Sequence, residues 1–252
     1  MCPANLHFAS YDSSPYGSKR VEIGCVFIHG LTGTPWALQE LEKYLARRNI
    51  AVSAPFLPGH GTDPRDLLNI PWETWVHTCR REVENLHRMC ENIFLLGFSM
   101  GGSIALILAS ELPIQGVISL SAPVMLRNPM IRLLPLMRPF VRYWKKKGRG
   151  SPDSYPLERG YDRYPIASVT EFMKLLHRAR SRLTEVRCPA LIMHAQGDRR
   201  VPDINAEIIY QNIGSKEKYK ILLEAPCHNI ARGENRQKVA EEVFRFIRNH
   251  SE

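Results

Sequence analysis

The sequence predicts an α/β protein with a mostly parallel sheet covered by helices on both faces. Short apolar runs alternate with longer segments in which apolar side chains recur at helical spacing. Such alternation is typical of β-α-β units, whose strands lie parallel and are buried on both sides. The sequence shows no internal repeat and no low-complexity tract.

Each expected element follows from its own pattern. The strands are short apolar runs, at 21–30, 50–55, 92–97, 115–122, 189–195 and 217–224. The helices repeat apolar residues every three or four positions, at 35–48, 71–90, 103–110, 202–213 and 234–250. In 71–90, for example, Val76, Cys79, Val83 and Leu86 fall on one face. Pro35 suits a first helical turn, where a missing N–H costs nothing.

Composition restricts the class of protein. The chain has 252 residues, 44% of them hydrophobic and 23% charged, which is typical of a globular protein with one sizeable core. The first ten residues lack the pattern of a signal peptide. The six cysteines form no C-x-x-C unit, so we expect reduced thiols in a cytoplasmic protein. The net charge of +9 favours an anionic partner but does not require one.

The longest charge-free run, Asn92 to Ser110, raises the question of a membrane helix. Its 19 residues are close to the length that spans a bilayer. Gly97, Gly101 and Gly102 lie at its middle, where glycine weakens a helix and suits a sharp turn. A buried strand, a tight turn and a buried helix explain the run better than a membrane span does.

The turn itself reads G-F-S-M-G, residues 97–101, and matches the nucleophile elbow G-x-S-x-G. In such an elbow the serine sits on a strained turn after a strand, and glycines at both sides avoid collisions with neighbouring backbone. The following helix points its N-terminal amides at the site. The alternative is a tight strand-to-helix turn with an incidental serine. The position between an expected strand and an expected helix favours Ser99 as a nucleophile.

A serine nucleophile needs a base and an acid that orients the base. Where the nucleophile sits in an elbow, the chain order is serine, acid, histidine. Of the nine histidines, His228 is the one downstream in a suitable loop, after the last expected strand. Asp198 directly follows the strand 189–195, and we expect Arg199 and Arg200 to help keep it ionised. Asp203 is the alternative acid, although its place after Pro202 suits a helix start.

Other residues near strand ends have supporting roles in this interpretation. We expect the oxyanion to be bound by the backbone amides of Leu31, in the loop after the first strand, and Met100, after the serine. His29 is expected to fix the first of these loops. His60, in L-P-G-H-G, is expected to brace its own loop by hydrogen bonds.

The chain resembles the α/β-hydrolase superfamily, and within it the small bacterial carboxylesterases and monoacylglycerol lipases. The shared motifs are H-G-L-T-G-T-P, L-P-G-H-G-T-D-P, G-F-S-M-G-G, D-R-R-V-P and the final histidine loop. They occur in order and cover nearly the whole chain. Pro226-Cys227 departs from the pattern, because relatives often have a serine and small residues before the histidine, and this puts the local loop shape in doubt.

The resemblance implies the α/β-hydrolase fold and an esterase with a Ser-His-Asp triad, a small cap, no metal and no cofactor. Expected substrates are carboxylic esters of small to medium-chain acyl groups, monoacylglycerols included. In monoacylglycerol lipases a cap acid binds the glycerol hydroxyls. By position this implies Glu158, with Asp162 as runner-up. An equally good interpretation is that this acid is simply solvated within a basic region and binds no substrate.

The interval 124–183 is too long for a loop and is expected to be the cap, inserted between two core segments, 1–123 and 184–252. Residues 127–187 contain fifteen Lys and Arg and five acids, so this region carries +10 and the rest of the chain −1. Prolines at 129, 135 and 139 predict short helices. The apolar residues Leu133, Leu134, Phe140 and Trp144 either line an acyl pocket or, with Lys145, Lys146 and Lys147, dock on anionic lipid.

Three alternatives to an esterase remain from the sequence. A thioesterase or amidase would use the same triad. A non-catalytic binding protein would share the fold, but the complete Ser-Asp-His set argues against it. Nucleic-acid binding through the cap has only charge in its favour, because there is no recognisable motif and no aromatic platform, so no nucleic-acid partner is expected.

Overall fold

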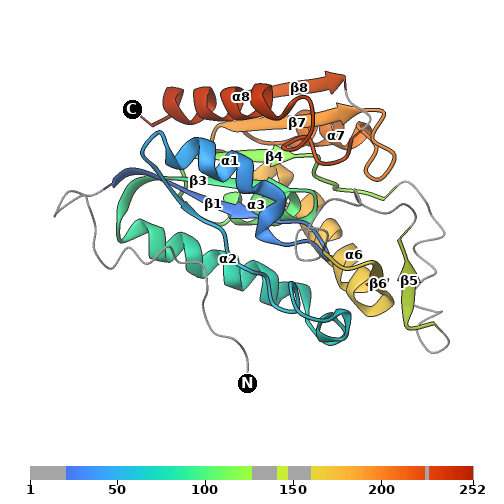
Figure 1. Cartoon of the computed structure of the whole chain (residues 1–252). Coiled ribbons are helices and arrows are strands. Elements are labelled where there is room, and N and C mark those ends of the chain that lie inside the picture. Colours follow the sequence, from blue (N-terminus) through green and yellow to red (C-terminus); the bar gives the residue numbers. More distant parts are fainter. Residues whose placement is uncertain (1–20, 127–140, 147–159, 225–226, 252) are drawn as a thin grey trace.

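The computed structural model describes residues 21–126, 141–146, 160–224 and 227–251. Its centre is a six-stranded parallel sheet with the strand order β2-β1-β3-β4-β7-β8 (Figure 1). The strands are β1 (Val21–Ile28), β2 (Ile50–Ser53), β3 (Cys90–Phe98), β4 (Gly116–Leu120), β7 (Ala190–Gln196) and β8 (Lys218–Glu224). The predicted fold class, a parallel sheet between helices, is confirmed.

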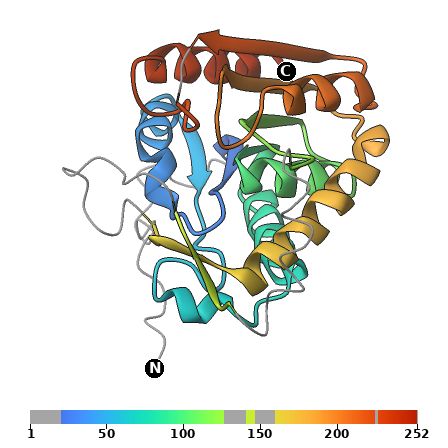
Figure 2. The ribbon, with the colours of Figure 1, turned by 90° about the vertical axis from the view of Figure 1, so that its right-hand side faces the viewer.

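Helices cover both faces of this sheet (Figures 1 and 2). α1 (Gln39–Ala46) and α8 (Arg236–Asn249) lie on one face, and α2 (Trp72–His87), α3 (Met100–Ala109) and α6 (Ile166–Ser181) lie on the other. α7 (Ile204–Asn212) and the short 3₁₀ helices η1 (Pro35–Leu38), η2 (Pro64–Leu67) and η4 (Leu183–Glu185) complete the layers. Successive β1 residues alternate between the two faces: Phe27 packs in the α1–α8 cluster and Ile28 in the α2–α3 cluster.

The charge-free run folds as a strand, a one-residue turn and a helix. β3 ends at Phe98, Ser99 forms the turn, and α3 begins at Met100 with every residue buried. The run lacks charge because both elements lie inside the protein, as the sequence predicted. Among the residues that the structure describes, no helix is long and apolar enough to cross a membrane.

The described part of the expected cap contains an element that the sequence analysis did not assign. Ile166–Ser181 forms the four-turn helix α6, and its side chains Phe172, Leu175, Leu176 and Ala179 join the buried cluster beneath α2 and α3. Because α6 packs against α2 and α3, which cover the sheet, we propose that the core resumes near residue 166 and that the inserted cap ends there, earlier than 183.

Before α6, the region expected to form the cap contains a small two-stranded sheet. β5 (Tyr143–Lys145) pairs antiparallel with β6 (Arg163–Pro165), which leads directly into α6. This small sheet is seen beside α6, at the right of Figure 1. The short helices expected around Pro129, Pro135 and Pro139 fall outside the described residues.

Candidate active site

Four loops meet at one edge of the sheet. The loops after β1, β3, β7 and β8 contain Leu31, Ser99, Asp198 and His228, in that order. In a parallel sheet all carboxyl ends lie on the same edge, so residues far apart in the sequence come together there. The topology therefore brings the sequence-predicted residues to one place.

Ser99 occupies a backbone conformation that few non-glycine residues adopt. Its φ is 54° and its ψ −124°, and its N–H donates to the Leu120 carbonyl over 2.8 Å. The flanking glycines leave no room for a side chain: a Cβ on Gly97 would lie 2.1 Å from the Gly101 oxygen, and one on Gly101 would lie 2.0 Å from the Ile28 oxygen. The close passage of β1, β3 and α3 thus requires glycine on both sides of the serine.

The loop after β1 lies against this turn. A Cβ built on Gly30 would lie 3.2 Å from the Ser99 Cβ and 3.6 Å from its Oγ, so Leu31 follows directly beside the serine. Gly33 N–H donates to the Gly30 oxygen over 2.9 Å. Because carbonyl and N–H of a trans peptide point in opposite directions, holding the Gly30 carbonyl also orients the Leu31 N–H. Met100 is the first residue of α3, so its amide is one of those without an intrahelical acceptor.

His29 holds the same peptide from the other side of the loop. Its Nδ1 lies 3.0 Å from the Gly30 oxygen, and its Nε2 lies 3.2 Å from the Leu57 N–H. A carbonyl only accepts and an amide N–H only donates, so Nδ1 carries the proton and Nε2 accepts. His29 is therefore neutral and fixes the loop after β1, as expected, and it also connects this loop to the loop at 57–60. His60 packs edge-on against His29 and its Nδ1 donates to the Pro58 carbonyl.

Hydrogen bonds connect Ser99, His228 and Asp198 in a chain. His228 Nε2 lies 3.0 Å from Ser99 Oγ, and His228 Nδ1 lies 2.6 Å from Asp198 Oδ2. A carboxylate accepts at Nδ1, which leaves Nε2 with a lone pair directed at the serine hydroxyl. The three side chains come from three different loops, and this geometry allows the histidine to take the serine proton.

Comparison with known proteins places the chain in a family. A model described as the alpha/beta hydrolase family matches residues 25–235. The chain belongs to the α/β hydrolase family. It is similar to a thermostable monoacylglycerol lipase of Bacillus sp. (strain H-257), with 30% identity over 95% of this chain and 96% of that protein. It also resembles a carboxylesterase of Bacillus subtilis (strain 168), with 25% identity over 92% of this chain and 95% of that one.

Solved structures show the same likeness. A metagenome-derived lipolytic enzyme, from work on LipS and LipT, superposes with a TM-score of 0.86 at 28% identity, over 92% of this chain and 95% of that chain. A monoacylglycerol lipase of Paleococcus ferrophilus superposes with a TM-score of 0.77 at 20% identity, over 92% and 98% of the two chains. The latter supports the fold alone.

In this hydrolase, the environment of Asp198 favours its ionised form. Burial on its own raises the pKa of the carboxyl, but the hydrogen bond and charge of His228 and the N–H groups of Arg200 and Val201 together lower it below its usual value. The two amides donate to Oδ1 over 2.8 and 3.1 Å. Arg200 acts on Asp198 through its main-chain N–H, and because the side chains of Arg199 and Arg200 are exposed, the expected help from their charges stays a prediction.

His194 is a residue that the sequence analysis passed over as part of a strand. It is buried in β7, its Nε2 donates to the Val201 carbonyl over 2.9 Å, and it lies 3.7 Å from Asp198 Oδ2. It therefore closes the loop that carries the acid. A histidine inside an otherwise apolar strand, four residues before the candidate acid, was the available signal.

The base has its own support. Asn229, next to His228, donates from Nδ2 to the Ala37 carbonyl over 3.0 Å, which ties the histidine loop to η1. The Cys227 thiol donates to the Asn229 carbonyl over 3.4 Å, so the unusual cysteine has a contact within this loop. Residues 225–226 fall outside the described residues.

The other candidates lie elsewhere or are not described. Asp203 precedes α7 at the N-cap position, where its side chain makes no capping hydrogen bond, and Asp198 holds the place beside His228. Glu158 lies outside the described residues. Asp162 is exposed, and both of its oxygens accept hydrogen bonds from the Arg163 guanidinium, over 2.8 and 3.2 Å.

Acid should destabilise the hydrolase through His29. Burial lowers the pKa of this imidazole to about 4, although its bond to the Gly30 carbonyl opposes the shift. As the pH falls below about 6.5, the His29 ring of the unfolded chain takes up a proton, whereas the ring in the folded protein stays neutral until about pH 4. The contribution of neutral His29 to the free energy of unfolding is therefore complete above pH 6.5 and decreases by roughly 3 kcal/mol between pH 6.5 and pH 4.

Urea unfolding at pH 7.5 and pH 5 measures the part of this decrease that falls above pH 5, about 2 kcal/mol, and NMR identifies the group. We expect the ring signals of His29 to stay unchanged between these pH values. A His29 ring that takes up its proton near pH 6.5 would contradict the prediction.

Proposed function

We propose that the protein is a serine hydrolase that cleaves carboxylic esters of small to medium-chain acyl groups, monoacylglycerols included. The observation that carries the proposal is the unbroken chain from Ser99 Oγ through His228 to Asp198, with distances of 3.0 and 2.6 Å. The carboxylesterase and monoacylglycerol lipase among its relatives support the same substrate class.

In the proposed reaction, Ser99 attacks the ester carbonyl while His228 Nε2 accepts its proton. Asp198 keeps the proton of His228 on Nδ1 and stabilises the imidazolium that forms. The alcohol leaves with the proton from His228, and water then hydrolyses the acyl-enzyme by the same steps.

We propose the amides of Leu31 and Met100 as the donors to the oxyanion. Support comes from the position of Gly30 against Ser99 and from the hydrogen bonds that fix the Gly30 carbonyl. On the other side, the positive end of the α3 dipole adds to the stabilisation of developing negative charge. Removing one such donor typically costs about 10²–10³-fold in kcat.

Two measurements test the proposed function. A fluorophosphonate probe should label the wild-type protein at Ser99, since it reacts with an activated serine. Turnover of p-nitrophenyl esters of graded chain length, compared with monoacyl- and triacylglycerols, then defines the substrate class. Absence of labelling together with absence of ester hydrolysis would refute the proposal.

Glu158 is proposed to bind the glycerol hydroxyls, with Asp162 as the alternative. The Arg163 guanidinium already occupies both oxygens of Asp162, which favours Glu158. We expect Glu158→Ala to reduce monoacylglycerol turnover about tenfold, because a hydrogen bond to a charged group is lost, and to leave p-nitrophenyl ester turnover nearly unchanged. Asp162→Ala is the matched control. Equal losses on both substrates would exclude the glycerol role.

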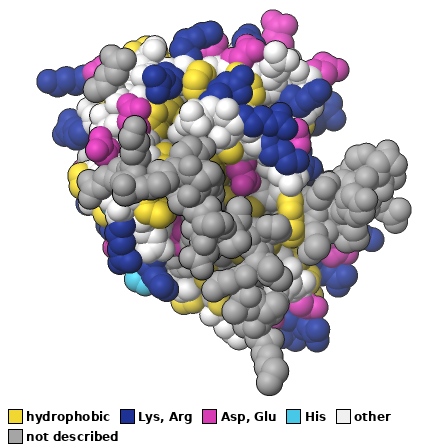
Figure 3. All heavy atoms as spheres, turned by 60° about the vertical axis from the view of Figure 1, so that its left-hand side comes forward, with side chains coloured by type: hydrophobic (Ala, Val, Ile, Leu, Met, Phe, Trp, Pro, Cys, Tyr) yellow, Lys and Arg dark blue, Asp and Glu magenta, His cyan; other side chains and the backbone are white. Residues whose placement is uncertain are grey.

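A contact of the cap with anionic lipid surfaces is proposed on the basis of charge, although only part of the cap is described. Trp144 is 46% exposed and Lys145 is exposed. In the view of Figure 3, Lys and Arg side chains lie at several separate places around the face, with acidic side chains among them. Co-sedimentation with vesicles tests this contact. If binding does not change with salt, and does not change when Lys145, Lys146 and Lys147 are replaced together by Gln, the cap does not have this role.

A further inference from the structure

The segment directly before β6 packs against the loop that carries Leu31. Tyr161 N–H donates to the Thr32 carbonyl over 2.9 Å. Gly160 has a φ of 64°, and a Cβ on it would lie 2.1 Å from the same oxygen. Main chain therefore packs directly on main chain at this point, and the contact requires glycine at position 160.

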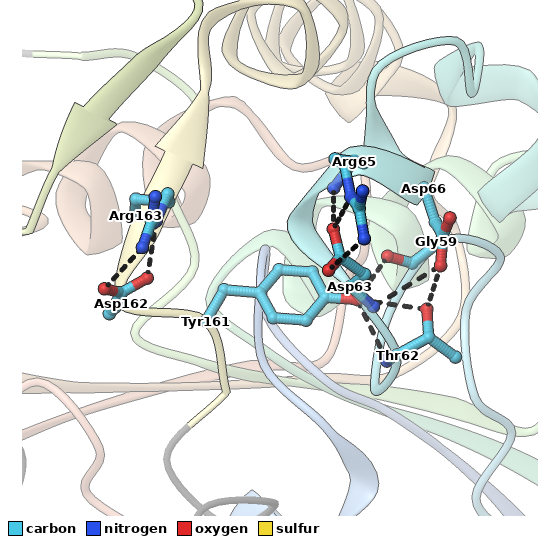
Figure 4. Close-up of polar contacts among 8 residues, drawn as sticks. All are labelled: Gly59, Thr62, Asp63, Arg65, Asp66, Tyr161, Asp162 and Arg163. Atoms are coloured by element: carbon cyan, nitrogen blue, oxygen red, sulfur yellow. Dashed lines mark hydrogen bonds and ion pairs between the residues drawn. The ribbon is translucent and has the colours of Figure 1, made fainter.

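The Tyr161 side chain extends from this contact to a second loop (Figure 4). It is buried, and its hydroxyl donates to the Gly59 carbonyl over 2.8 Å and accepts from the Thr62 N–H over 3.0 Å. Burial raises the pKa of the phenol, so the hydroxyl keeps its proton and donates. Thr62 in turn donates from Oγ1 to Asp66 over 2.6 Å, which fixes the loop to η2.

Thr32 is a strained residue next to the proposed oxyanion donor. Its φ is 59°, it is buried, and its Oγ1 donates to the Leu31 carbonyl over 2.6 Å. Such a conformation persists only where the surroundings hold it. Beyond its own turn, Gly160 and Tyr161 both contact the Thr32 carbonyl, among the residues that the structure describes.

We propose that Tyr161 is a positioning residue, which holds the Leu31 amide in place for the oxyanion by tying Thr32 to the loop at 59–62. The inference rests on the proposed function. The main-chain N–H of Tyr161 contacts the oxyanion loop, and its hydroxyl keeps that N–H where it is. The cap is thereby connected to the catalytic geometry as well as to the substrate.

An alternative role for Tyr161 is to stabilise the cap alone, and kinetics separates the two. A displaced oxyanion donor weakens the transition state and lowers kcat, whereas a displaced cap wall weakens substrate binding and raises KM. The test variant is Tyr161→Phe, which removes only the hydroxyl. Tyr143→Phe is the matched control, because Tyr143 lies on β5 of the same small sheet and no hydrogen bond of its hydroxyl is found among the described residues.

For Tyr161→Phe we expect kcat on a short p-nitrophenyl ester to fall about tenfold with KM unchanged within about twofold, less than the roughly 10²–10³-fold cost of losing an oxyanion donor outright. The rate of fluorophosphonate labelling should fall in parallel, and Tyr143→Phe should retain both rates. A rise in KM at constant kcat, or no change in either, would overturn the proposal.

Gly160→Ala provides a second test in which the hydroxyl remains. Its added Cβ displaces the Thr32 carbonyl, so kcat should again fall about tenfold or more. A folded Gly160→Ala protein with wild-type kcat would refute the role of this contact.

Amide hydrogen exchange tests whether Tyr161 holds the two loops without any measurement of activity. Tyr161→Phe should accelerate exchange at Thr62 and Gly33 about tenfold, while Tyr143→Phe should not. If the wild-type protein neither hydrolyses esters nor reacts with the probe, the proposed function fails by itself. Unchanged exchange at both amides would instead show that Tyr161 does not hold the two loops.

Discussion

Ser99→Ala is expected to reduce kcat for ester hydrolysis by roughly 10⁴–10⁶-fold without unfolding the protein. The hydroxyl is the proposed nucleophile, and its described hydrogen-bond partner is His228 Nε2 at 3.0 Å. Alanine keeps the Cβ and therefore the packing against Gly30. His228→Ala should cost a similar amount, because the members of such a triad act as a unit. Steady-state kinetics on a p-nitrophenyl ester, with circular dichroism and melting, measures both effects.

The serine that caps the other end of α3 provides the control. Ser110 follows the last turn of the helix, where its Oγ donates to the Ile107 carbonyl over 2.7 Å. Ser110→Ala should retain kcat. Should Ser99→Ala keep more than about 1% of the wild-type kcat on a folded protein, Ser99 is not the nucleophile.

The second large effect is expected at the acid. Asp198→Asn should lower kcat by up to roughly 10⁴-fold, less than the loss at Ser99. An asparagine amide facing His228 Nδ1 favours the tautomer with the proton on Nε2, so the imidazole no longer accepts the serine proton. The amides of Arg200 and Val201 would still hold the side chain at this position.

Asp203→Asn separates the two candidate acids. Asp203 lies at the N-cap of α7 and makes no capping hydrogen bond, so its change to Asn should leave kcat within about twofold of wild type. If Asp203→Asn is the damaging change and Asp198→Asn is silent, the assignment of the acid is wrong. Both variants conserve size, so their stabilities can be compared directly by thermal melting.

The strands of the sheet could be predicted because the pattern that indicates each strand lies within its own short stretch of sequence. Buried parallel strands appear in a sequence as short apolar runs, and both ends of each of the six strands lie within two residues of the expected positions. The elbow was equally visible, since Gly97 and Gly101 are required by the backbone passing 2.0–2.1 Å from their absent Cβ atoms. The order of loops on a parallel sheet then brings Ser99, Asp198 and His228 to one edge.

The segment that forms α6 was assigned to the cap because it lies in 124–183, an interval between strands that is too long for a loop. Phe172, Leu175, Leu176 and Ala179 do repeat at helical spacing, so the pattern of a core helix was present. The basic residues between these apolar positions obscured the pattern of a core helix. In the structure Arg178 and Arg182, together with Arg80 of α2, surround the carboxylate of Glu111. Much of the positive charge around α6 therefore pairs with the core.

Tertiary hydrogen bonds are what the sequence could not predict. Tyr161 contacts Gly59 across 102 residues, and His29 contacts Leu57 across 28. Neither contact has a local pattern, because each depends on where two loops lie after the sheet has formed. The residues that support a site are for this reason harder to predict than the residues that carry its chemistry.

The strand order also has a consequence for biosynthesis. Ser99 and the Leu31 loop belong to the part of the chain that leaves the ribosome first, whereas His228 follows Ser99 by 129 residues and comes after β8, at the edge of the sheet. At translation rates of about 5–20 residues per second, a nascent chain carries its serine for on the order of ten seconds without a base. With the proposed triad, ribosome-bound and prematurely terminated chains that end before His228 are expected to be inert towards esters.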